Sequence, residues 1–229
     1  MDYSYESNEM SFPKYLSKCF MWMFLGLLFS FATAALFSYT GLFESIYFSF
    51  GMGFTLVISI IEIVLVLSVS RVVFKLNTKK AVTLFLIYSV INGITLSYIF
   101  YCFDLTSIIY VFLATAGIFG AMAILGHTTK LDLSKLGTFL TVSLIGMLIA
   151  GIILMFAFNE TVYLWYSILG IALFMLITAY DIHIIKRLYY NATSLEQQNA
   201  LAIYGALQLY LDFINIFIRL VYLFARNRD

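Results

Sequence analysis

Seven apolar stretches, each about as long as a membrane is thick, dominate this sequence of 229 residues. They lie at about 19–39, 46–70, 81–103, 107–126, 137–158, 162–185 and 201–225. A helix of about 20 apolar residues crosses a bilayer, where only helices and closed barrels satisfy all backbone hydrogen bonds. A barrel strand would alternate in polarity over about ten residues, and TFLTVSLIGMLIAGIILMFAF does not. The sequence therefore predicts an all-α polytopic membrane protein with seven transmembrane helices.

The composition agrees with this class and indicates one domain. Hydrophobic residues make up 63% of the chain and charged residues 11%, far from the balance of a soluble domain. The connections are short, and the single proline, Pro13, precedes the first stretch. We predict a cytoplasmic N-terminal segment, 1–18, and a single seven-helix membrane domain, 19–229. The net charge of +1 does not indicate nucleic acid as a partner, and we expect none.

The basic residues divide the connections into two groups. Connections on one side contain Glu44, Asp104 and Glu160 and no base. Ten of the 13 Lys and Arg residues lie on the other side, at Lys14, Lys18, Arg71, Lys75, Lys79, Lys80, Lys130, Lys135, Lys186 and Arg187. Short loops rich in Lys and Arg face the cytoplasm, so we predict a cytoplasmic N-terminus and, after seven crossings, a C-terminus outside. A last segment that dips in and returns would put the C-terminus inside, which the terminal arginines mildly favour.

Three acids lie within the apolar stretches: Glu62, Asp181 and Asp212. A charge at the bilayer centre costs about 2.5–3.5 kcal/mol on insertion scales, so each acid is a candidate functional residue. At about 1.5 Å per residue, Asp181 lies roughly 8 Å from the cytoplasmic end of its helix, while Glu62 and Asp212 lie near the middle. Arg71 ends the second stretch at a depth similar to that of Asp181. The alternatives are a membrane anchor for Arg71, an interfacial position for Asp181, and neutral hydrogen-bonded acids between helices.

A polar stripe runs along the last apolar stretch. Asp212, Asn215 and Arg219 are spaced i, i+3 and i+7, which places all three on one face of a helix. We therefore expect this face to contact protein or water and not lipid.

Several segments resemble the Bax inhibitor family, also called the transmembrane Bax inhibitor motif family. Its two aspartate segments are matched by AYDIHIIK, with Asp181, and LYLDFINIFI, with Asp212; IYSVINGITLS and GAMAILGHTTKLDLSKLG are similar to its bacterial branch. The seven-span layout covers nearly the whole chain. The resemblance implies a bundle whose last helix is wrapped by the other six. It also implies a pH-sensitive calcium leak governed by the two aspartates and by an arginine near the end of the second span, matched by Arg71 with Lys75 as the competing candidate.

On this interpretation Asp181 and Asp212 share protons and form a weak calcium site across the sixth and seventh helices. Two carboxylates held close together do not both ionise readily, so the pair should titrate as a unit. Calcium takes carboxylate oxygens, although two or three acids make a weak site. Arg71 beside Asp181 would form a latch that acid releases. We expect no cofactor and no catalytic residue, with calcium and protons as ligands.

Other functions could use the same acids. One is a proton-coupled cation exchanger. Another, implied for some relatives, is a non-transport role in which the protein modulates other membrane proteins, such as a quality-control protease. An intramembrane aspartyl protease would also use paired aspartates, but its G-x-G-D and P-A-L motifs are missing, because the sequence reads LYLD and no proline follows Pro13. We therefore expect a non-enzymatic protein of a bacterial inner membrane, with the bilayer and other membrane proteins as candidate partners.

Overall fold

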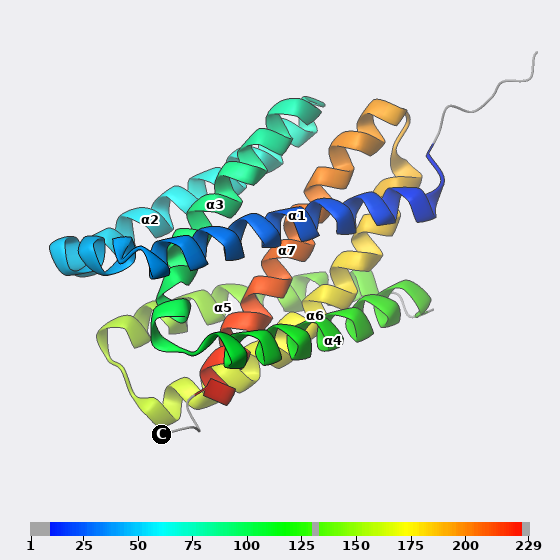
Figure 1. Cartoon of the computed structure of the whole chain (residues 1–229). Helices are drawn as coiled ribbons and strands as arrows, with labels where there is room; N and C mark the ends of the chain where they lie inside the picture. The colour runs from blue at the N-terminus through cyan, green and yellow to red at the C-terminus, as the bar shows by residue number, and fades with distance from the viewer. Residues whose placement is uncertain (1–9, 130–132, 226–229) are drawn as a thin grey trace, which may run out of the picture.

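The structure, a computed structural model, describes residues 10–129 and 133–225. Its helices are α1 (Phe12–Tyr39), α2 (Leu42–Phe74), α3 (Thr78–Cys102), α4 (Leu105–Thr128), α5 (Gly137–Phe156), α6 (Glu160–Asn191) and α7 (Leu195–Ala225), with a short 3₁₀ helix, η1 (Leu133–Leu136), before α5. Seven of them are long and apolar enough to cross a membrane. The predicted all-α fold with seven spans is confirmed, and Figure 1 shows the bundle.

Local sequence signals determine where several helices begin. Pro13 occupies the first turn of α1, where its missing N–H costs no helical hydrogen bond. The side chains of Asn77, Asp104 and Asn159 cap α3, α4 and α6 by accepting backbone N–H groups three residues further on, at 3.1, 2.8 and 3.0 Å. These caps fix the first residues of the three helices.

The helix α2 has a kink that the absence of proline did not predict. Gly51 has φ 54° and ψ −138°, a backbone conformation that other residues rarely adopt. The part of α2 long and apolar enough to span the membrane is therefore Gly53–Phe74. Glu62 and Arg71 both lie in this straight segment.

Helix ends predicted to share one membrane face lie together. The backbone N–H of Met10 donates to Oε1 of Gln198 (3.0 Å), and Nζ of Lys18 donates to Oδ1 of Asn199 (2.7 Å), which joins the start of α1 to the start of α7. The ring of Phe12 stacks on His127 near the end of α4, with centroids 5.6 Å apart. These contacts agree with alternating crossings.

The helix α7 is the centre of the bundle. Of its most apolar 18-residue window, 72% is buried, against 11% for α5. In Figure 1 α7 runs between α1 and α6 (orange to red), and it also packs against α2, α3 and α4. The expected wrapping by six helices needs one correction: within the described residues α5 packs on α6 and η1 and does not approach the backbone of α7. This is physically reasonable because the side chains of α5 are almost all apolar and its backbone hydrogen bonds are made within the helix, so the rest of its surface can face lipid.

Candidate functional site

Asp181 and Asp212 lie together inside the bundle. Asp181, on α6, is 6% exposed, and Asp212, on α7, is 3% exposed. Both line one cavity of about 320 Å³ between α5, α6 and α7, at the gap where α5 fails to reach α7. The two carboxyl groups are close enough to interact electrostatically. The sequence-based expectation that these two acids are neighbours across α6 and α7 is thus met by the geometry.

The two carboxyl groups have few hydrogen-bond partners. Gln208 Nε2 donates to Oδ2 of Asp181 at 3.3 Å. Thr178, one turn before Asp181 on α6, lies near the Asp212 carboxyl, but its hydroxyl donates to the backbone carbonyl of Phe174 at 2.8 Å. Oδ2 of Asp212 has no hydrogen-bond partner in the described part of the chain. A buried carboxyl oxygen without a partner is costly while charged, so this oxygen is available to a proton or to a cation that enters the cavity.

The wall of the cavity is mixed in character. Leu140, Leu144 and Leu148 of α5 form an apolar side, whereas Tyr180 and Asn215 add polar atoms beside the acids. A space of this size has room for several waters, since one water occupies about 30 Å³ of the liquid. The arrangement can therefore hold a partly hydrated small cation within reach of two carboxylates.

The predicted polar stripe on α7 exists and is longer than expected. Nη1 of Arg219 donates to Oδ1 of Asn215 at 3.1 Å, which confirms that the two share a face. Gln208, which the sequence reasoning missed, extends the stripe by one turn before Asp212. The signal was present in the spacing of 208, 212, 215 and 219, which continues the same face of the helix.

Arg219 is buried without a carboxylate partner among the described residues. It is 9% exposed, and its guanidinium lies over the rings of Phe174 (4.9 Å) and Tyr166 (5.3 Å). Nη2 also donates to the Tyr166 hydroxyl at 3.4 Å, while Nε has no partner in the part of the chain that is described. Gly170 leaves room for this side chain, because a Cβ there would collide with the guanidinium. Cation–π contact therefore takes the place of an ion pair.

Arg71 is exposed and does not contact the acid pair. Neither Arg71 nor the competing Lys75, which is also exposed, has an ion-pair partner within residues 10–129 and 133–225. The helices α2 and α6 do not pack on each other, whereas both pack on α7. The latch implied by the family resemblance is thus not formed in this conformation.

Glu62 belongs to a separate polar cluster between α1, α2, α3 and α7. Its Oε1 accepts hydrogen bonds from Asn92 Nδ2 (3.2 Å) and Thr95 Oγ1 (2.8 Å). The Tyr210 hydroxyl donates to Oδ1 of Asn92 (2.8 Å) and lies 2.6 Å from the Ser30 hydroxyl. The structure therefore divides the three membrane acids into one aspartate pair and one isolated glutamate on the opposite side of α7.

A seven-helix bundle with two carboxyls facing one cavity inside it defines a polytopic membrane protein with an ionisable intramembrane site. The chain belongs to the family described as inhibitor of apoptosis-promoting Bax1, whose sequence model matches residues 13–229. This family is one of membrane proteins and is not known as an enzyme family.

Three bacterial relatives are similar to most of the chain. An uncharacterized protein of Borreliella burgdorferi is 36% identical over 100% of this chain and 99% of its own. The inner membrane protein YbhL of Escherichia coli K12 is 33% identical over 93% of this chain and 92% of its own. An uncharacterized membrane protein of Streptococcus pyogenes serotype M1 is 40% identical over 74% of this chain and 73% of its own. The resemblance found in the aspartate segments is thus confirmed as family membership, and this chain is an integral membrane protein.

Proposed function

We propose that this protein is a pH-sensitive calcium leak channel of a bacterial inner membrane, with Asp181 and Asp212 as its proton and cation site. The observation that carries the proposal is the pair of buried carboxyls in one cavity within the membrane-spanning segments. Burying one such acid is costly, and burying two that repel each other is more so. The presence of two acids at one site is explained if a cation or a proton passes there.

The site has the chemistry of a weak cation site. Calcium prefers six to eight oxygen ligands, and tight sites supply several carboxylates. Among the described residues no group of three or more acids, histidines or cysteines forms a metal cluster, so Asp181 and Asp212 would share the ion with water and amide oxygens. Weak binding suits a leak, because an ion that binds tightly does not leave.

The pH response follows from the charge of the pair. At higher pH the pair carries negative charge, and in the closed channel Arg71 would reach Asp181 when the cytoplasmic end of α2 moves towards α6. Acidification protonates the pair, removes this attraction and lets the helices separate. Arg71 is exposed in the present structure, and on this proposal that position would be the one with the latch released. We therefore propose that calcium flux rises as pH falls.

The orientation forms part of the proposal. The basic connections lie in the cytoplasm, the N-terminus lies inside and the C-terminus lies outside, which puts Asp181 on the cytoplasmic side of Asp212. YbhL of Escherichia coli is named an inner membrane protein, which supports the same location here. A role in modulating other membrane proteins would be compatible with this placement.

The experiment is calcium uptake by liposomes that contain the purified chain, recorded over a series of pH values with the same pH on both sides. A leak gives flux that increases on acidification without any proton gradient. A proton-coupled exchanger, the second candidate for the same acids, gives uptake that requires an imposed proton gradient and that moves protons in return. Absence of calcium flux at every pH and under every gradient would reject both and leave the non-transport role.

A further inference from the structure

Arg219 lies directly beyond one end of the cavity that holds the aspartate pair. On the side towards the C-terminus of α7, the lining of this cavity ends with Leu148 of α5, Phe174 of α6 and Asn215 of α7. The guanidinium of Arg219 lies 4.9 Å from the centre of the Phe174 ring, and its Nη1 donates to Oδ1 of Asn215 at 3.1 Å. Arg219 therefore contacts two of the three residues that close this end of the cavity.

The side chain of Arg219 fills the junction between α5, α6 and α7. A Cβ added to Gly170 of α6 would collide with the Arg219 side chain and would lie 2.9 Å from the terminal methyl of Met147 on α5. The Tyr166 hydroxyl accepts from Nη2 of Arg219 at 3.4 Å, and only 9% of the arginine is exposed. The space between the three helices, which is open beside the aspartate pair, is thus occupied by a guanidinium one turn beyond Asn215.

The positive charge of Arg219 acts on the aspartate pair from a short distance. Its polar contacts in the described part of the chain are to the neutral groups of Asn215 and Tyr166, so no carboxylate at contact distance offsets it. Arg219 follows Asp212 by seven residues on one face of α7, or about 10 Å at 1.5 Å per residue. At an effective dielectric constant of about 20, one unit charge at this distance changes the affinity for a monovalent cation about tenfold. The change for a divalent cation is about a hundredfold, because the energy doubles with the charge of the ion.

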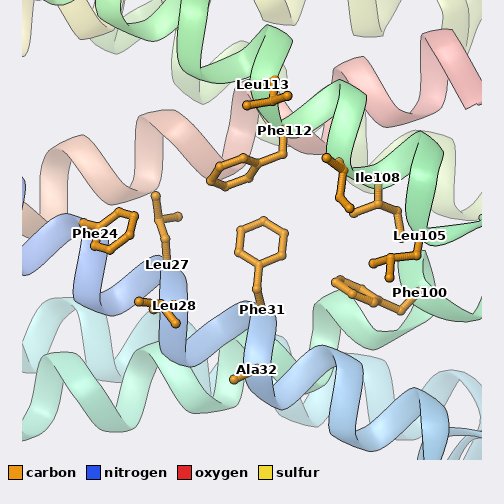
Figure 2. A pocket seen from close by; sticks show the side chains of 11 residues that line it. Phe24, Leu27, Leu28, Phe31, Ala32, Phe100, Leu105, Ile108, Phe112 and Leu113 are labelled. Carbon is orange, nitrogen blue, oxygen red and sulfur yellow. The ribbon is translucent and has the colours of Figure 1, made fainter.

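A second cavity of the bundle offers a cation no route around Arg219. This cavity lies between α1, α3 and α4, has a volume of about 440 Å³ and is lined by Phe, Leu, Ile and Ala side chains. Figure 2 shows these side chains, with the rings of Phe31 and Phe112 facing each other at the centre. A charge in such surroundings is costly because no group there can pair with it. We therefore expect a cation at the aspartate pair to leave past Arg219 or by the way it entered.

We propose that Arg219 is a charge barrier between the aspartate pair and the end of the bundle where α7 finishes, and that it hinders divalent cations more than monovalent ones. This inference rests on the proposed cation leak and adds the residue that sets its rate and its selectivity. Two carboxylates by themselves favour a divalent ion, whereas the guanidinium offsets one of their two charges. Arg219 acts through its charge and does not bind the ion, because a guanidinium carries donors and no acceptor.

The test compares calcium flux with potassium flux in liposomes that contain the full chain, at one pH on both sides of the membrane. Arg219→Gln removes the charge and keeps a side chain that forms hydrogen bonds. We expect its potassium flux to rise by about tenfold, and its ratio of calcium to potassium flux to rise by about a further tenfold. Arg219→Met, which is uncharged and packs well on aromatic rings, should give the same ratio and decides the question if the glutamine variant does not fold.

Two further variants separate the charge from the shape of the side chain. Arg219→Lys keeps the charge and loses the planar guanidinium, so its ratio of calcium to potassium flux should stay close to that of the unmodified protein. Arg187→Gln is the matched control, because Arg187 is an exposed arginine of α6, and it should leave both fluxes unchanged.

Several results would overturn the charge barrier. If the unmodified protein carries calcium and Arg219→Gln leaves the flux ratio unchanged, the barrier is rejected and the proposed leak stands; ions then leave by another route, such as the Glu62 side of α7. Equal changes of the ratio in Arg219→Gln and Arg219→Lys would assign the effect to packing. A changed ratio in Arg187→Gln would assign it to the general charge of the protein. Absence of flux from the unmodified protein and all variants would reject the leak and the barrier together.

Discussion

Replacement of Tyr210 by phenylalanine removes one oxygen from the centre of the bundle and leaves the aromatic ring in place. The ring packs edge to face on Phe85 and Tyr88 at 5.7 and 5.6 Å, contacts that phenylalanine keeps. The hydroxyl donates to Oδ1 of Asn92 and lies 2.6 Å from Ser30 Oγ. The variant therefore isolates the hydrogen bonds that connect α7 to α1 and α3.

The two hydrogen bonds differ in what their loss costs. Ser30 retains the carbonyls of Ser89 (2.7 Å) and Gly26 (3.0 Å) as acceptors for its hydroxyl, whereas Oδ1 of Asn92 loses its donor from Tyr210. Hydrogen bonds between membrane helices average about 0.6 and reach about 1.7 kcal/mol, and an unpaired buried acceptor costs about 1–3 kcal/mol. We expect Tyr210→Phe to lower the free energy of unfolding by about 1–2 kcal/mol.

The assay is equilibrium unfolding in mixed micelles with increasing denaturing detergent. Tyr110→Phe is the matched control, because Tyr110 is 64% exposed and should cost close to nothing. In an Asn92→Leu background the acceptor is already gone, so Tyr210→Phe should lose most of its effect. Equal stability of Tyr210→Phe and Tyr110→Phe, or an undiminished cost in the Asn92→Leu background, would refute the reasoning.

Three further predictions concern topology and the acid pair. Cysteines introduced in 71–80, 127–136 and 186–197, in a variant without Cys19 and Cys102, should resist an impermeant thiol reagent applied outside; modification from outside would reverse the orientation. Gln208→Leu removes the donor that favours the charged form of Asp181, so the rise in flux should begin at higher pH in the liposome assay, and an unchanged profile would contradict that role. Arg71→Ala should raise flux at neutral pH and weaken the response to acid, while Lys75→Ala should do much less; the reverse order would assign the latch to Lys75.

The apolar stretches predicted the helices well, because a helix that spans a bilayer needs a minimum number of apolar residues, and such a run is visible in the sequence. The exceptions lie where helices continue past the hydrocarbon core. The helix α6 extends to Asn191 and α7 begins at Leu195, with charged residues that an apolar pattern does not count. The kink at Gly51 was missed because glycine permits a positive φ without requiring it. Only packing decides which glycine uses that freedom.

The site was predictable within each helix and less so between helices. The i, i+3 and i+7 spacing on α7 correctly placed Asn215 and Arg219 on one face, as their hydrogen bond confirms. Spacing does not say towards which neighbour a face is rotated. For this reason Glu62, close in depth to Asp212, turned out to bond with Asn92 and Thr95 on the opposite side of α7. The proximity of Asp181 and Asp212 was implied by the family resemblance, whereas depth alone paired Asp212 with Glu62.

The central claim is that the aspartate pair makes calcium flux depend on pH, and Asp212→Asn tests it most directly. Asparagine preserves the size of the side chain and its hydrogen bonding but cannot take up a proton. We expect the variant in liposomes to show flux that no longer changes with pH. Glu44→Gln, a carboxyl-to-amide change at an exposed residue near the start of α2, should behave like the unmodified protein. Flux of unchanged size and unchanged pH dependence in a correctly folded Asp212→Asn protein would reduce Asp212 to a structural acid and contradict the proposed mechanism.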